Sequence, residues 1–113
     1  MKYIITEKQS RLLEEPEKVL RVPSLSYFNN DWKVLQKFLK RRGYPPYSIS
    51  GNLDLYKVQI KSLGNLEYVG GDLDLYHTPI KSLGKLEYVE RSLDLEKTPI
   101  ESLGDLKHVG GYL

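Results

Sequence analysis

The stretch LDLYKVQIKSLGNLEYVGGD, residues 53–72, returns almost unchanged as LDLYHTPIKSLGKLEYVERS (73–92) and LDLEKTPIESLGDLKHVGGY (93–112). Nine of the twenty columns are identical in the three copies, and Leu113 begins the phrase a fourth time. A fixed period of this length predicts a solenoid, in which each copy forms one coil and buries its apolar side chains against its neighbours. Because such stacks present an extended surface, the repeat predicts a binding function without naming the partner.

Each copy begins with Leu-Asp-Leu, which alternates inward and outward as a short strand does. Equivalent strands of successive coils are expected to stack about 4.8 Å apart in a short parallel sheet. Other apolar columns should fill the remaining interior of each coil. In the first copy these columns are Ile60, Leu63, Leu66 and Val69.

The phrase L-x-L-x-x-(V/T)-x-I resembles the core of leucine-rich repeats, and its twenty-residue period resembles their short bacterial class. The wording TPIKSLG (78–84) and NLEYVGG (65–71) is similar to repeat proteins encoded by bacteriophages and their hosts. The resemblance covers residues 49–113. It implies an α/β solenoid, a right-handed leucine-rich-repeat-like coil, in an accessory protein that engages a host or viral protein. One departure is that Val58, Thr78 and Thr98 stand where such repeats carry a laddered asparagine.

Residues 1–48 contain no copy of the repeat, and we expect them to form a helical N-terminal cap on a solenoid that occupies residues 49–113. The capping box Thr6–Gln9 predicts a first helix to about Glu15, with an apolar continuation over 19–22. A second helix is predicted from about Asp31 to Arg42, with Asn30 as N-cap and a left-handed Gly43 after its end. Its apolar face, Trp32, Leu35, Phe38 and Leu39, should seal the first coil.

The overall charge of +2 hides a division between the two halves. Residues 1–50 carry ten Lys/Arg and five Asp/Glu, whereas residues 51–113 carry seven and ten. The absence of cysteine excludes disulfides and thiol chemistry. With no signal-like or membrane-spanning stretch in the sequence, we expect a cytoplasmic protein, in the host cytoplasm if a phage encodes it.

The outward side chains around each predicted strand form columns that we interpret as the protein-binding surface, because tyrosine provides rigid contact area. Three stacked carboxylates repel one another, and this favours a functional reason for them over a merely solvated face. The candidate residues are Asp54, Tyr56, Lys57, Asp72, Asp74, Tyr76, His77, Asp94, Glu96 and Lys97.

A nucleic-acid-binding function is an alternative interpretation. Lys37, Lys40, Arg41 and Arg42 gather at the end of the second helix, near two tyrosines. Cations at a helix carboxyl end also complement the helix dipole, and no known nucleic-acid motif accompanies the cluster. We therefore favour the structural interpretation.

A sugar-active or metal-dependent enzyme is a second alternative, since stacked Asp54 and Asp74 roughly match the ~5–5.5 Å carboxylate separation of retaining glycosidases. A short open sheet offers no cleft that excludes water, and each coil supplies too few ligands for a calcium site. We therefore expect a protein that is not an enzyme and binds no cofactor or metal.

The carboxyl-terminal end of the repeat lacks a polar cap in the sequence. Its last coil should expose leucines and a strand edge, unless Tyr112 and Leu113 cover them. Homo-oligomerisation through these two residues is therefore a further expectation.

Overall fold

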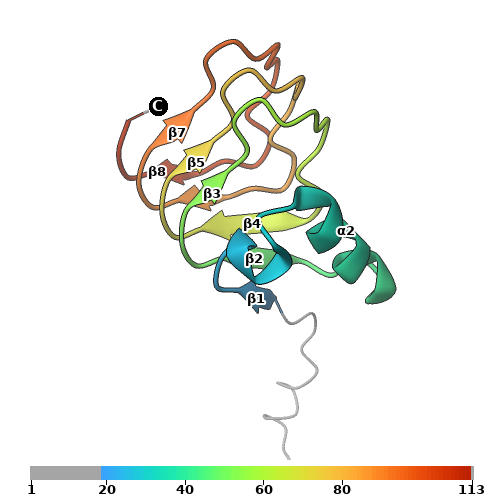
Figure 1. Cartoon of the computed structure of the whole chain (residues 1–113). Coiled ribbons are helices and arrows are strands. Elements are labelled where there is room, and N and C mark those ends of the chain that lie inside the picture. Colours follow the sequence, from blue (N-terminus) through green and yellow to red (C-terminus); the bar gives the residue numbers. More distant parts are fainter. Residues whose placement is uncertain (1–18, 113) are drawn as a thin grey trace, which may run out of the picture.

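The computed structural model describes residues 19–112, which form a β-solenoid of stacked coils with parallel sheets and one α-helix (Figure 1). A three-stranded sheet contains β3 (Leu53–Asp54), β5 (Leu73–Asp74) and β7 (Leu93–Asp94). A five-stranded sheet has the order β1 (Leu20–Val22), β2 (Tyr47–Ile49), β4 (Leu66–Val69), β6 (Tyr88–Val89) and β8 (His108–Val109).

The predicted stacking of the three Leu-Asp-Leu strands is confirmed. Leu53 pairs with Leu73 and Leu73 with Leu93, so neighbouring coils differ by one repeat length. The strands are held by ladder hydrogen bonds. The N–H of Leu55 donates to the carbonyl oxygen of Asp74, and that of Leu75 to Asp94, both at 2.9 Å.

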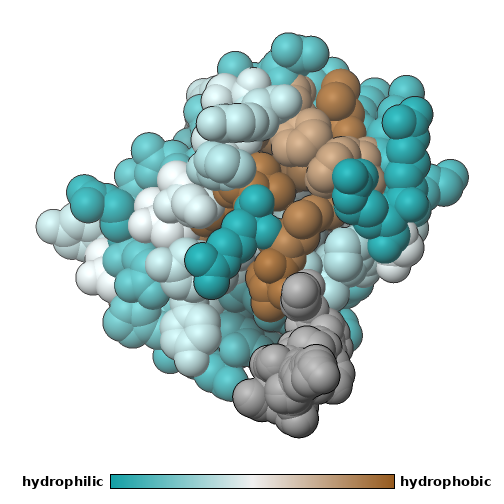
Figure 2. Space-filling model, turned by 90° about the horizontal axis from the view of Figure 1, so that it is seen from below, coloured by the Kyte–Doolittle hydropathy of each residue, from teal (hydrophilic) through white to brown (hydrophobic). Residues whose placement is uncertain are grey.

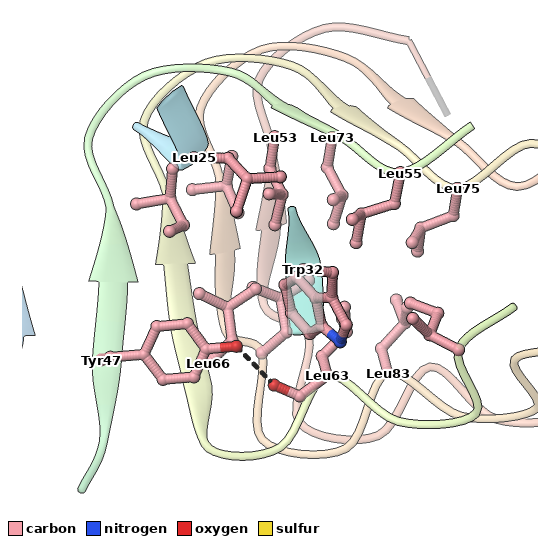
Figure 3. Close-up of a cluster of buried hydrophobic side chains, with 14 of the residues drawn as sticks. Leu25, Trp32, Tyr47, Leu53, Leu55, Leu63, Leu66, Leu73, Leu75 and Leu83 are labelled. Atoms are coloured by element: carbon pink, nitrogen blue, oxygen red, sulfur yellow. Dashed lines mark hydrogen bonds between the residues drawn. The ribbon is translucent and has the colours of Figure 1, made fainter. Parts of the chain in front are cut away.

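The interior rows are also confirmed for the first two coils. Leu53, Leu55, Leu66 and Val69 are completely buried, and their counterparts one coil on are at most 1% exposed. Figure 3 shows the pairs Leu53–Leu73, Leu55–Leu75 and Leu63–Leu83 side by side, with Trp32 and Leu25 among the first-coil leucines. The apolar rows therefore form one core that runs along the stack.

The five-stranded sheet was not predicted, because buried and exposed residues do not alternate regularly along its strand β4. Tyr47 pairs with Leu66 and Ser48 with Tyr68, so Glu67 is an extra residue in the ladder. Such a bulge leaves two outward side chains in succession. Leu66 and Val69 are buried while Glu67 and Tyr68 between them are not. The pattern in-out-out-in does not have the period of two that identifies a strand in a sequence.

The stack begins earlier than the repeat itself. Ile49 pairs with Val69, as expected for a partial coil before Leu53, and the predicted domain boundary after residue 48 falls inside β2. One further strand, β1, pairs with β2 through Val22 and Ile49. The apolar segment over 19–22, which we assigned to a helical cap, thus contains a strand, because its backbone joins the edge of the sheet.

The second predicted helix is present as α2 (Trp32–Arg41), and it follows a short 3-10 helix, η1 (Leu25–Phe28). Its N-cap is Asp31 rather than Asn30. Asp31 Oδ1 accepts the N–H of Lys33 at 2.9 Å, whereas Asn30 has a left-handed φ of 54°. Gly43 is left-handed as predicted, with φ 77°.

The predicted apolar face of α2 is buried in the core through Trp32, Leu35 and Leu39. Seen from the β1 end, the surface still carries an apolar patch among polar residues (Figure 2). The helix predicted from Thr6 to Glu15 lies outside the described residues.

A buried hydrogen bond joins the start of the stack to its first full coil. The hydroxyl of Tyr47 donates to the carbonyl oxygen of Leu63 at 2.8 Å, as the dashed line in Figure 3 marks. Tyr47 is 1% exposed, and its burial raises the pKa of the phenol far above the ordinary value. The hydroxyl therefore stays protonated and remains a donor.

Replacing Tyr47 by Phe should lower the free energy of unfolding by about 1–2 kcal/mol, because the buried Leu63 carbonyl loses its donor. Urea denaturation measures the difference. Tyr27→Phe is the matched control, since Tyr27 is 71% exposed and should change stability little. Equal stability of both variants would show that the hydrogen bond contributes nothing.

Candidate functional site

The aspartates of the strand column have a structural role that the sequence did not reveal. In each coil, Oδ1 of the aspartate accepts a hydrogen bond from the backbone N–H two residues later. Asp54 accepts from Tyr56 at 3.1 Å, Asp74 from Tyr76 at 3.0 Å and Asp94 from Glu96 at 2.9 Å. A side chain that accepts in this way stabilises a turn. The repeated carboxylate is thus explained by the turn after each strand, without a ligand.

That turn holds the next residues in a fixed conformation. In the first coil, the N–H of Val58 donates to the carbonyl oxygen of Leu55 at 2.9 Å, and the second and third coils repeat the bond at 3.2 and 3.3 Å. The third residue of each turn is left-handed, with φ 60° at Lys57, 59° at His77 and 59° at Lys97. A left-handed backbone is unfavourable for residues other than glycine, so these positions store strain.

The side chains displayed by these turns form a surface that we call the turn ladder: Tyr56, Lys57, Tyr76, His77, Glu96 and Lys97. Tyr56 and Tyr76 stack with ring centroids 5.1 Å apart and planes inclined by 11°. The ammonium of Lys57 lies 5.3 Å from the Tyr56 ring centroid, and His77 meets Tyr76 edge-on at 6.0 Å. Tyr56 is nevertheless 50% exposed. The structure thus brings the predicted tyrosines together as a stacked aromatic pair flanked by polar groups.

Asp72, also predicted to bind a partner, connects successive coils through hydrogen bonds. Asn52 Oδ1 accepts the N–H of Asp72 at 2.7 Å, and Asp72 Oδ1 accepts the N–H of Ser92 at 2.9 Å. The N–H of Tyr112 donates to Ser92 Oγ at 3.3 Å and completes the series. This column supplies the side-chain ladder that is missing at Val58, Thr78 and Thr98. At Gly71 this approach leaves no room for a side chain, because a Cβ there would lie 2.1 Å from Asn52 Oδ1.

A second outward surface was missed because the five-stranded sheet was missed. Its strands align one residue each in a column: Arg21, Ser48, Tyr68, Tyr88 and His108. A groove of about 500 Å³ lies on this face, between residues of β1 and β2 and the two tyrosines. In the sequence, this surface could have been recognised from two consecutive polar residues that recur in each copy. These are Glu-Tyr at 67–68 and 87–88 and Lys-His at 107–108. The third copy has Lys107 where the first two have Glu67 and Glu87. Lys107 forms a salt bridge to the neighbouring coil, with its Nζ 3.5 Å from Glu87 Oε1.

The basic residues considered for nucleic-acid binding remain exposed at the end of α2. Lys40 and Arg41 lie in its last turn, and Arg42 is the C-cap. The guanidinium carbon of Arg42 lies 3.9 Å from the centroid of the Phe38 ring, which is a cation–π contact within the helix end. Lys37 is exposed one turn earlier. These basic residues thus lie where positive charge interacts favourably with the dipole of the helix, at its C-terminus.

No cluster of three or more His, Cys, Asp or Glu side chains capable of holding a metal ion occurs within residues 19–112. The same part of the chain has no helix with the length and apolar character needed to cross a membrane. Of the two residues expected to mediate self-association, Tyr112 is 85% exposed and Leu113 lies outside the described residues.

No family model matches this chain, and no curated protein or solved structure is significantly similar to it.

His77→Gly should raise the free energy of unfolding by about 1 kcal/mol, because glycine removes the cost of a left-handed side-chain-bearing residue. Thermal and urea denaturation measure the change. Lys85→Gly is the matched control in the same coil: Lys85 is exposed and is not among the residues with positive φ, so glycine there should destabilise. A loss of stability in His77→Gly would contradict the left-handed turn.

Proposed function

We propose that this protein is a non-catalytic protein-binding module of the leucine-rich-repeat type and that the turn ladder is its recognition surface. The observation that carries the proposal is the stacked pair Tyr56–Tyr76, of which Tyr56 is 50% exposed and Tyr76 is partly buried, held on turns that the aspartates fix. Tyrosine contributes large contact area at little entropic cost when its side chain is already ordered, and it is enriched where proteins bind proteins.

The polar neighbours favour a protein partner with mixed charge. Lys57 and His77 lie against the aromatic pair, and Glu96 and Lys97 take the corresponding positions in the third coil. A central aromatic anchor with a polar rim is the usual arrangement of a protein–protein interface. The surface therefore combines an aromatic pair, which provides affinity, with charged groups that select the charge of the partner.

An enzymatic role for the aspartate column has less support. Oδ1 of each aspartate already accepts a backbone N–H, and the strand face is not a cleft that removes water from two carboxylates. The resemblance of the repeat sequence to phage-encoded and bacterial repeat proteins supports a biological role as an accessory protein. Such a protein would act in the host cytoplasm on a host or viral protein.

The decisive experiment compares capture by three forms of the immobilised chain in bacterial lysate, read by quantitative mass spectrometry. Tyr56→Ala with Tyr76→Ala removes the aromatic pair and leaves the turn-fixing aspartates intact. Specific partners should fall by about tenfold or more, as expected when an interface anchor worth over 1.4 kcal/mol is lost.

Tyr68→Ala with Tyr88→Ala is the matched control, because it removes two tyrosines of adjacent coils from the five-stranded sheet. Both double variants should retain the circular dichroism spectrum of the parent chain. Capture that survives in the turn-ladder variant, or that disappears in the control instead, would remove the turn ladder as the recognition surface.

A further inference from the structure

One row of side chains in the turn ladder changes its chemistry between the second and the third coil. Its first two members, Tyr56 and Tyr76, stack on each other, and its third member is Glu96. The N–H of Lys57 donates to the carbonyl oxygen of Tyr76 at 2.8 Å. The N–H of His77 donates to that of Glu96 at 3.0 Å, so the backbone continues the row without interruption. A carboxylate therefore occupies the position where a third tyrosine would extend the stack.

The ring of Tyr76 has a tyrosine on one side and this glutamate on the other. Stacking on Tyr56, with ring centroids 5.1 Å apart and planes inclined by 11°, covers one face of the Tyr76 ring. His77 meets the ring at an angle of 77° and does not stack on it. The row continues past Tyr76 to Glu96, which is exposed. We call the place formed by Tyr76 and Glu96 the Tyr–Glu site. It lies between two neighbouring coils, inside the stack.

The first coil shows which group such a ring attracts. The ammonium of Lys57 lies 5.3 Å from the centroid of the Tyr56 ring, which is a cation–π contact. In the second coil, histidine takes the position of this lysine. Within residues 19–112, no lysine or arginine makes a cation–π contact with Tyr76, and no salt bridge involves Glu96. The Tyr–Glu site therefore combines an aromatic ring and a carboxylate that both lack a cation in this part of the chain.

The arginines of the described chain are placed elsewhere. Arg91 Nε lies 3.8 Å from Asp72 Oδ1, and Arg42 lies over an aromatic ring of its own helix end. Arg21 belongs to β1, at the edge of the other sheet, and Arg41 lies in the last turn of α2. A guanidinium that fits the Tyr–Glu site therefore has to come from another molecule.

We propose that the Tyr–Glu site binds an arginine side chain of the protein partner. A guanidinium is planar, so it can stack on the ring of Tyr76 while its N–H groups donate in pairs to the carboxylate of Glu96. A lysine ammonium is a compact, strongly hydrated charge without this flat shape. Arginine and tyrosine are also residues on which binding energy concentrates in protein interfaces. The inference rests on the proposed function, because it names the residue with which that partner contacts the turn ladder.

The test titrates the full chain with Nα-acetyl-arginine amide and follows the NMR signals of the Tyr76 ring and of Glu96. Both should shift saturably, with a dissociation constant in the millimolar range. Nα-acetyl-lysine amide should bind about threefold or more weakly, because it cannot stack as a plane. Nα-acetyl-citrulline amide has nearly the same shape as the arginine probe but no charge. It should bind about tenfold or more weakly, because its hydrogen bonds to the carboxylate are no longer charge-assisted on both sides.

Variants of the chain assign the binding to the two residues. Glu96→Gln preserves the size of the side chain and removes its charge, so it should weaken the arginine probe by about tenfold or more. Tyr76→Leu removes the ring face and should weaken the probe by about threefold or more. Glu101→Gln is the matched control, since Glu101 is an exposed carboxylate of the same coil outside the turn ladder, and it should leave binding unchanged. Each variant should retain the circular dichroism spectrum of the parent chain.

Absence of saturable binding, equal binding of the arginine and citrulline probes, or equal binding by the parent and Glu96→Gln chains would overturn the proposal. So would a concentration-dependent dimer that Arg41→Gln dissolves, because the arginine would then come from a second copy of the chain. Failure of the proposed function is a separate result, in which capture from lysate does not depend on the tyrosine pair. Capture that depends on the pair, together with no binding of the arginine probe, would retain the proposed function and reject the arginine.

Discussion

Each coil is held in place by stacking in register on the coil before it, displaced by one twenty-residue repeat. The displacement brings each leucine, isoleucine and valine of one copy beside its own counterpart in the next, as with Leu53, Leu73 and Leu93. It also aligns the backbone groups of two parallel sheets. Strands of two residues, such as β3, are too short to be stable alone, so their order depends on the rows of apolar side chains between the sheets.

The polar columns serve this stacking in different ways, and the difference separates positions with a structural role from positions without one. Asn52, Asp72 and Ser92 connect successive coils, and Asp54, Asp74 and Asp94 fix the turn inside each coil. Changes at these positions alter the scaffold itself. Tyr56 and Tyr76 contact each other and solvent on turns that the scaffold fixes, which makes them suitable for recognition. A column of identical residues in a solenoid can therefore mark a structural requirement, and here the proposed binding groups lie beside such a column.

Much of the solenoid was predictable from sequence because repetition and burial coincide. The alternation in Leu53-Asp54-Leu55 and the apolar face of Trp32, Leu35 and Leu39 both appear in the structure as predicted. The second sheet was hidden by the extra residue Glu67, and β1 is a short strand outside the repeat, placed by pairing with β2. The site was predicted less completely. Asp74 looks the same in sequence whether it caps a backbone N–H or contacts a partner, and nothing in the types Lys57 and Lys97 indicates a left-handed backbone.

The natural absence of cysteine permits a direct test of the stacking register. Tyr68 and Tyr88 are paired residues of adjacent strands, so Tyr68→Cys with Tyr88→Cys places two thiols within disulfide reach. Oxidation of this double variant should give an intramolecular disulfide, detected by mass spectrometry of the proteolysed chain. Tyr68→Cys with His108→Cys, two coils apart, should not. Equal cross-linking of both pairs, or none in the first, would contradict the stacked coils on which the fold and the proposed recognition surface depend.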